Sequence, residues 1–76
     1  MDQSRHTIQG LHRKLTKLLD ALVAEEVTVT VGRGGLIFRG DGIESGRALL
    51  LMQDIESLYR VHPVSMRTML KARRGS

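Results

Sequence analysis

Apolar residues recur every three or four positions through the first third of the chain. The members of this series are Ile8, Leu11, Leu15, Leu18 and Leu22. Such spacing places the side chains along one side of an α-helix, and the residues between them are mostly polar or charged. The pattern therefore predicts an amphipathic helix over about residues 4–24.

The apolar period shortens to two in the middle of the chain. Valine and threonine alternate over residues 27–31, which is the pattern of a half-buried β-strand. A Gly-Arg-Gly-Gly sequence follows at residues 32–35, and glycine readily adopts the positive φ angles of a tight hairpin turn. Residues 36–38, Leu-Ile-Phe, again suit a strand. Together these segments predict a β-hairpin.

The expected turn fixes which side chains of the hairpin share a face. With residues 33–34 in the turn, Val31 lies opposite Leu36, and the neighbouring pairs follow in register. The face assigned to the core comprises Val27, Val29, Val31, Leu36 and Phe38. Ile37 falls on the other face, so we expect it to be exposed.

A second helix is predicted after the hairpin, over about residues 43–61. Asp41 and Glu44 are three residues apart, which is the spacing of a capping box at a helix N-terminus. The main apolar stripe of this helix comprises Ala48, Leu51, Met52, Ile55, Leu58 and Tyr59. Leu49 and Leu50 lie outside the stripe. Either the helix is buried on two sides or these two leucines bind a partner.

Pro63 ends the second helix, because proline disfavours helical backbone in the residue that precedes it. Residues 64–72 suit a short third helix with Met66 and Met69 on one side. Methionines at such positions either fill gaps in a core or form an adaptable binding surface. Residues 73–76 are expected to form a frayed basic tail.

The order of these elements predicts a small α+β fold, helix–β-hairpin–helix (αββα), with a short basic C-terminal helix or tail. We expect a single domain over residues 1–72, followed by the tail. The chain has 76 residues and no cysteine, and one core of this size supplies only about 3–5 kcal/mol of stability. Disulfides are excluded, and the three histidines lack metal-ligand spacing, so no cofactor is expected. Self-association or docking on a larger protein is the remaining way to reinforce the fold.

The expected compartment follows from what the sequence lacks. No run of about 18 apolar residues is present, so we expect no membrane contact. The N-terminal stretch is polar and shows no secretory signal pattern. A cytoplasmic location is the resulting expectation.

The net charge of +4 is unevenly distributed. Residues 25–62 contain four basic and six acidic side chains, whereas residues 63–76 contain four basic and no acidic ones. The basic residues that we consider for contact with phosphates or with an acidic protein surface are Arg13, Lys17, Arg67, Lys71, Arg73 and Arg74. These residues also suit an ordinary solvated face. Phosphate contacts of this kind would be salt-sensitive and tolerant of nucleic-acid sequence.

No residue pattern indicates an enzyme. The glycine-rich segment at residues 32–35 precedes a strand, whereas a phosphate-binding loop precedes a helix N-terminus. Asp54 and Glu56 are two residues apart on a helix and do not face each other. Glu25 and Glu26 lie at a helix-to-strand junction, where we expect them to be solvated. We therefore expect a non-enzymatic protein with no small-molecule substrate.

Several features of residues 11–59 occur together in a known family. The leucine-rich helix ends at residues 19–22, a hairpin glycine precedes the Leu-Ile-Phe strand, and the second helix closes at residues 55–58. With its arginine-rich C-terminus, the chain resembles the W-type head-completion proteins (head–tail connectors) of lambda-like tailed phages. The resemblance implies an αββα fold, ring assembly at a phage portal, a tail that becomes ordered on assembly, and residence in the host cytoplasm or virion.

We therefore expect a binding or assembly module of phage or mobile-element type, which self-associates or docks on a larger protein complex. The apolar residues expected to bind the partner are Leu49, Leu50, Ile37, Met66 and Met69. One alternative is a small nucleic-acid-binding regulator that uses the basic faces of the first helix and the C-terminus. Another is a phage-encoded inhibitor of a host protein complex.

Overall fold

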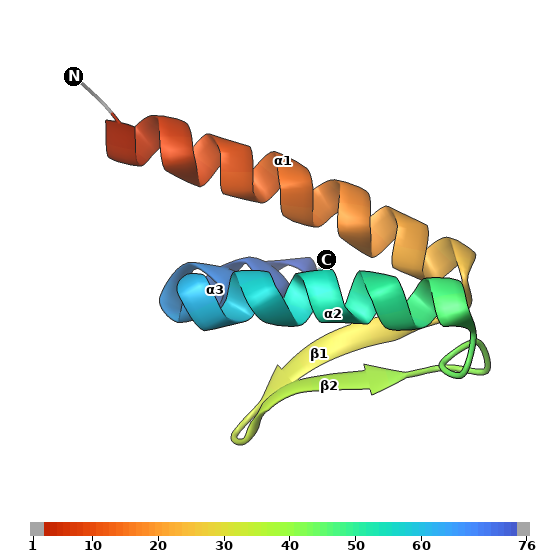
Figure 1. The fold of residues 1–76 in the computed structure, drawn as a ribbon. Helices are drawn as coiled ribbons and strands as arrows, with labels where there is room; N and C mark the ends of the chain where they lie inside the picture. Colours follow the sequence, from red (N-terminus) through yellow and green to blue (C-terminus); the bar gives the residue numbers. More distant parts are fainter. Residues whose placement is uncertain (1–2, 75–76) are drawn as a thin grey trace.

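Figure 1 shows the fold in a computed structural model, which describes residues 3–74 and, for side chains, residues 9–72. The elements in chain order are α1 (Gln3–Ala24), β1 (Thr28–Gly32), β2 (Gly35–Arg39), α2 (Gly46–Val61) and α3 (Pro63–Arg74). The predicted α+β class and helix–hairpin–helix arrangement are confirmed. The third helix continues two residues past its predicted end at Ala72, so the first two residues of the expected tail, Arg73 and Arg74, belong to α3.

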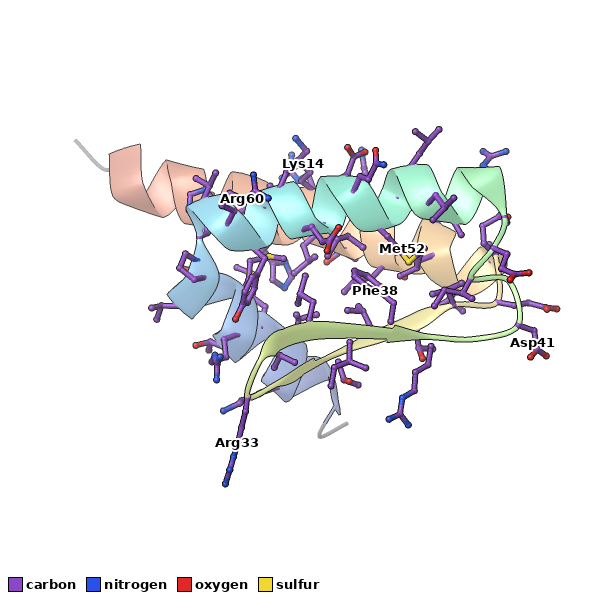
Figure 2. All side chains as sticks on the ribbon, turned by 60° about the horizontal axis from the view of Figure 1, so that its bottom comes forward. Lys14, Arg33, Phe38, Asp41, Met52 and Arg60 are labelled. Atoms are coloured by element: carbon purple, nitrogen blue, oxygen red, sulfur yellow. The ribbon has the colours of Figure 1, made fainter. Side chains whose placement is uncertain are left out.

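Strands β1 and β2 pair antiparallel in the predicted register. Val31 lies opposite Leu36, and Val29 lies opposite Phe38. All four side chains are partly buried against the core, and Figure 2 shows Phe38 between the hairpin and α2. Ile37 is 41% exposed, because alternate residues of a strand point to opposite faces.

The core lies among the three helices and the inner face of the hairpin. Figure 1 shows α1 and α2 on the same side of the hairpin, and α3 packs against both α2 and β1. Among the described side chains, the buried apolar residues are Leu11, Leu15, Leu19, Leu22, Val27, Ala48, Met52, Ile55, Met66 and Leu70. The predicted stripes of α1 and α2 therefore both face the core.

The third helix belongs to the core and is not an appended tail. Met66 is fully buried and Leu70 is 5% exposed. The assignment of Met66 to a partner-binding surface is therefore wrong. Its burial follows from the corner before α3, where His62 has φ −128° and ψ 61° and so leaves the helical region. As predicted, Pro63 ends α2, and it then occupies the first position of α3, where a missing N–H costs nothing.

The second helix begins later than the sequence predicted. Its N-cap is Ser45, whose Oγ accepts a hydrogen bond from the Ala48 N–H at 3.2 Å. Residues 41–44 form turns. The capping box of Asp41 and Glu44 is therefore wrong, because the chain is still turning at these residues.

The delayed start of α2 has a steric cause at the end of α1. The N–H of Gly42 donates to the carbonyl oxygen of Glu26 at 3.3 Å. A Cβ atom on Gly42 would overlap the carbonyl oxygen of Glu25. This close approach of two backbones accounts for the glycine, and it holds the turn against the junction between α1 and β1.

Candidate partner-binding groove

The apolar residues predicted to bind a partner lie on separate surfaces. Leu49 is 48% exposed and Leu50 is 64% exposed, but consecutive residues of a helix point in directions about 100° apart. Ile37 lies on the outer face of the hairpin, away from the core. Met69 is half-buried on α3. The structure therefore does not bring these four side chains together.

A second exposed apolar residue, which the sequence reasoning missed, lies on the same side of α2 as Leu50. Val61 lies eleven residues later, which is about three turns along the same side of the helix, and it is 69% exposed. Asp54 and Ser57 lie between them and are also exposed. We call these four residues the outer side of α2. The eleven-residue spacing of Leu50 and Val61 in the sequence could have indicated that they share one side of the helix.

The predicted basic residues are divided between two helices. Arg13 and Lys17 are exposed and one turn apart on α1. Arg67 is half-buried on α3, where its Nη2 donates to the Tyr59 hydroxyl at 3.3 Å. Lys71, one turn after Arg67, is exposed. The side chains of Arg73 and Arg74 lie outside the described residues.

Two hollows lie along α1, one bordered by β1 and Leu70 of α3, and the other by Met69 of α3. One hollow, of about 200 Å³, lies towards the C-terminal end of α1, and its lining includes Leu19, Val23, Thr28, Thr30 and Leu70. A second, more open hollow is lined by Gln9, His12, Arg13, Thr16, Lys17 and Met69. We call the two hollows together the α1–α3 groove.

The two ends of the α1–α3 groove differ in chemistry. The hollow near the end of α1 is lined mainly by apolar side chains, with Val23 57% exposed at its edge. The other hollow has Arg13 and Lys17, with Met69 as its apolar part. Every described charged side chain that lines either hollow is basic. The groove therefore combines an apolar end with a basic end.

Sequence reasoning found three residues of the groove but not the groove itself. Arg13 and Lys17 were selected for their charge and Met69 for its flexibility. Nothing in the sequence places Met69 of α3 beside α1, because that contact depends on the corner at His62. The exposure of Val23 likewise depends on where β1 leaves the end of α1.

Other site types have no support among the described residues. Among residues 3–74, the side chains that the structure describes (residues 9–72) include no group of three or more histidine, aspartate and glutamate residues arranged to hold a metal ion. No helix within that range is long and apolar enough to cross a membrane. The most distinctive surfaces of the described part of the chain are the outer side of α2 and the α1–α3 groove.

No protein-family model matches the chain, and no curated protein or solved structure is significantly similar to it. The resemblance to phage head-completion proteins therefore stays a prediction. The surfaces that bear on function are the outer side of α2 and the α1–α3 groove.

Proposed function

We propose that the protein is a non-enzymatic binding module that self-associates, or docks on a larger protein, through the outer side of α2 and the adjacent Leu49. One observation carries the proposal. Ala48, Met52 and Ile55 complete the buried face of α2, yet Leu49 and Leu50 remain about half or more exposed. Large apolar side chains that the core does not use are candidates for contact with another protein.

The size of the chain supports the same proposal. The side chains described, residues 9–72, include ten buried apolar residues. Such a core is small, and small domains commonly gain stability by oligomerisation when they have no disulfides. Burial of Leu50 and Val61 against a second copy would remove two apolar side chains from water. Each full burial of this kind contributes about 1.5–3 kcal/mol.

Sedimentation equilibrium over a range of protein concentrations tests this proposal. We expect a dimer or larger species for the unmodified chain, and a monomer with unchanged circular dichroism for Leu50→Glu. Thr68→Glu is the matched control, because it adds the same charge to an exposed polar position of a different helix, α3. Loss of the fold in Leu50→Glu would contradict the proposal, as would a monomeric unmodified chain at every concentration.

We propose phage or mobile-element assembly as the setting, on the strength of the resemblance to head-completion proteins. Inhibition of a host complex is the other setting proposed for a binding module of this size. Both settings use the same apolar surface of α2, so the sedimentation experiment applies to each.

A nucleic-acid-binding regulator is the competing function, and one observation favours it. Arg13 and Lys17 are exposed, one turn apart, and share a hollow whose described lining has no acidic side chain. Fluorescence anisotropy with labelled duplex DNA tests this function. Micromolar binding that weakens steeply as salt rises supports the regulator, and absence of binding at low salt rejects it.

A further inference from the structure

We propose that the α1–α3 groove binds an amphipathic helix of another protein, with acidic residues at one end of that helix. This goes beyond the proposed function, because it concerns a different surface from the outer side of α2 and a specific kind of partner.

The apolar hollow is the right size for side chains of a partner. Its volume is about 200 Å³, which is enough for one or two apolar side chains, and the second hollow is larger and more open, at about 760 Å³. Leu19 and Leu70, both almost fully buried, form part of its floor, whereas Val23 at its edge is 57% exposed. An apolar side chain entering this hollow would cover Val23 and contact the edge of the core.

The charged side chains that line the second hollow favour an acidic partner. Arg13 and Lys17 line the second hollow, and the described lining of both hollows holds no carboxylate to neutralise them. The hydroxyl of Thr16 donates to the carbonyl oxygen of His12 at 2.8 Å within α1. Gln9 and His12 are the other polar side chains that line this hollow, and complementary charges on the partner opposite Arg13 and Lys17 would fix its orientation.

The length of the groove suits a helix. Gln9 and Val23, at its two ends, are fourteen residues apart on α1, which corresponds to about 21 Å or four turns of an α-helix. A helix laid in such a groove presents apolar anchors at positions i, i+3, i+4 and i+7. Met69 lines the second hollow, and its flexible thioether adapts to such anchors.

The apolar end of the groove favours a protein helix over nucleic acid. A phosphate backbone would satisfy Arg13 and Lys17 but would leave the hollow beside Val23 unfilled. His12 is the one aromatic ring in the described lining of the two hollows, so a row of stacked unpaired bases has no continuous platform. An acidic amphipathic helix satisfies both ends at once.

Titration of the ¹⁵N-labelled protein with a synthetic peptide, followed by NMR, tests the proposal. The probe is an amphipathic helical peptide of about 16 residues, with leucines at positions i, i+3, i+4 and i+7 and glutamates clustered in one half. A second peptide has glutamine in place of every glutamate. We expect amide shifts at Thr16, Val23 and Met69 with the first peptide, and an affinity at least about fivefold weaker with the second.

Two matched variants show whether the groove itself is responsible. Lys17→Glu reverses a charge that lines the groove, and Lys14→Glu makes the same change on the same helix at a position that does not line it. We expect Lys17→Glu to weaken peptide binding about tenfold or more, and Lys14→Glu to change it less than about twofold. Arg13→Glu provides a second groove variant if Lys17→Glu alters the circular dichroism spectrum.

Three results would overturn the proposal. The first is equal binding of the glutamate and glutamine peptides, and the second is an equal effect of Lys14→Glu and Lys17→Glu. The third is that duplex DNA, but not the acidic peptide, shifts the groove amides, which would assign the groove to nucleic acid. Because none of these experiments involves Leu49 or Leu50, their failure would leave the proposed self-association through α2 untouched.

Discussion

At the residue scale, Ser45 determines where the second helix starts. Its hydroxyl oxygen accepts the Ala48 N–H at 3.2 Å, and the hydroxyl also donates to the Glu25 carboxylate at 3.3 Å. The cap therefore satisfies a backbone donor at the helix N-terminus and also ties α2 to the end of α1. The ion pair between Arg47 and Glu25, 3.8 Å long with Arg47 80% exposed, adds little because solvent screens it.

Replacement of this cap is the first prediction. Ser45→Ala should lower the free energy of unfolding by about 0.5–2 kcal/mol, because it leaves a backbone N–H of α2 without its partner. Urea denaturation measures the change. Asp41→Ala is the control, since Asp41 is exposed and caps nothing, and it should change stability by less than about 0.5 kcal/mol. If Asp41→Ala destabilises the protein more than Ser45→Ala does, the capping box of Asp41 and Glu44 suggested by the sequence is the correct assignment.

The misplaced cap shows what the sequence could not supply at this scale. Asp41 and Glu44 have the spacing of a capping box, but so do many pairs that never form one. The deciding fact is the contact of Gly42 with the backbone of Glu25 and Glu26. That contact joins residues sixteen or more positions apart, and no local pattern encodes it.

At the element scale, the hairpin was predictable and the role of the third helix was not. Alternation over residues 27–31, followed by a two-residue turn, allows one register that buries a full face, and the structure has that register. In α3, the spacing of Met66 and Leu70 identifies one side of a helix but does not say what that side meets. The structure shows that it meets β1 and α2.

The second prediction concerns this buried side of α3. Met66→Ala should destabilise the protein by about 2–5 kcal/mol, because it removes a fully buried side chain and leaves a cavity. Met69→Ala, on the same helix but half-buried beside the groove, should have a clearly smaller effect. Thermal and urea unfolding of both variants measure the difference. Equal, small effects would mean that α3 contributes little to the core.

At the scale of the whole molecule, the two proposed binding surfaces follow from how the helices are arranged. The outer side of α2 faces solvent because the opposite side of that helix is filled by Ala48, Met52 and Ile55. The α1–α3 groove exists because the corner at His62 returns α3 beside β1 and α1. The sequence indicated the exposed leucines of α2 directly, since they break its apolar stripe. It gave no indication of the groove, whose lining comes from three elements.

The last prediction uses salt to separate the two surfaces. Screening shortens from about 10 Å at 0.1 M salt to about 3 Å at 1 M. Binding of the acidic peptide in the groove depends on Arg13 and Lys17, which are exposed, so its affinity should fall steeply over this range. Self-association through Leu50 and Val61 buries apolar area and should persist or strengthen, since salt weakens charge pairs and not apolar contacts.

Parallel measurements on one preparation check this difference. Sedimentation gives the oligomeric state and NMR titration gives the peptide affinity at each salt concentration. Leu50→Glu should abolish self-association and leave peptide binding unchanged. Lys17→Glu should weaken peptide binding and leave self-association unchanged. If both processes weaken together as salt rises, or if either variant abolishes both, then one surface serves both contacts. In that case the separation of the groove from the outer side of α2 has no functional meaning.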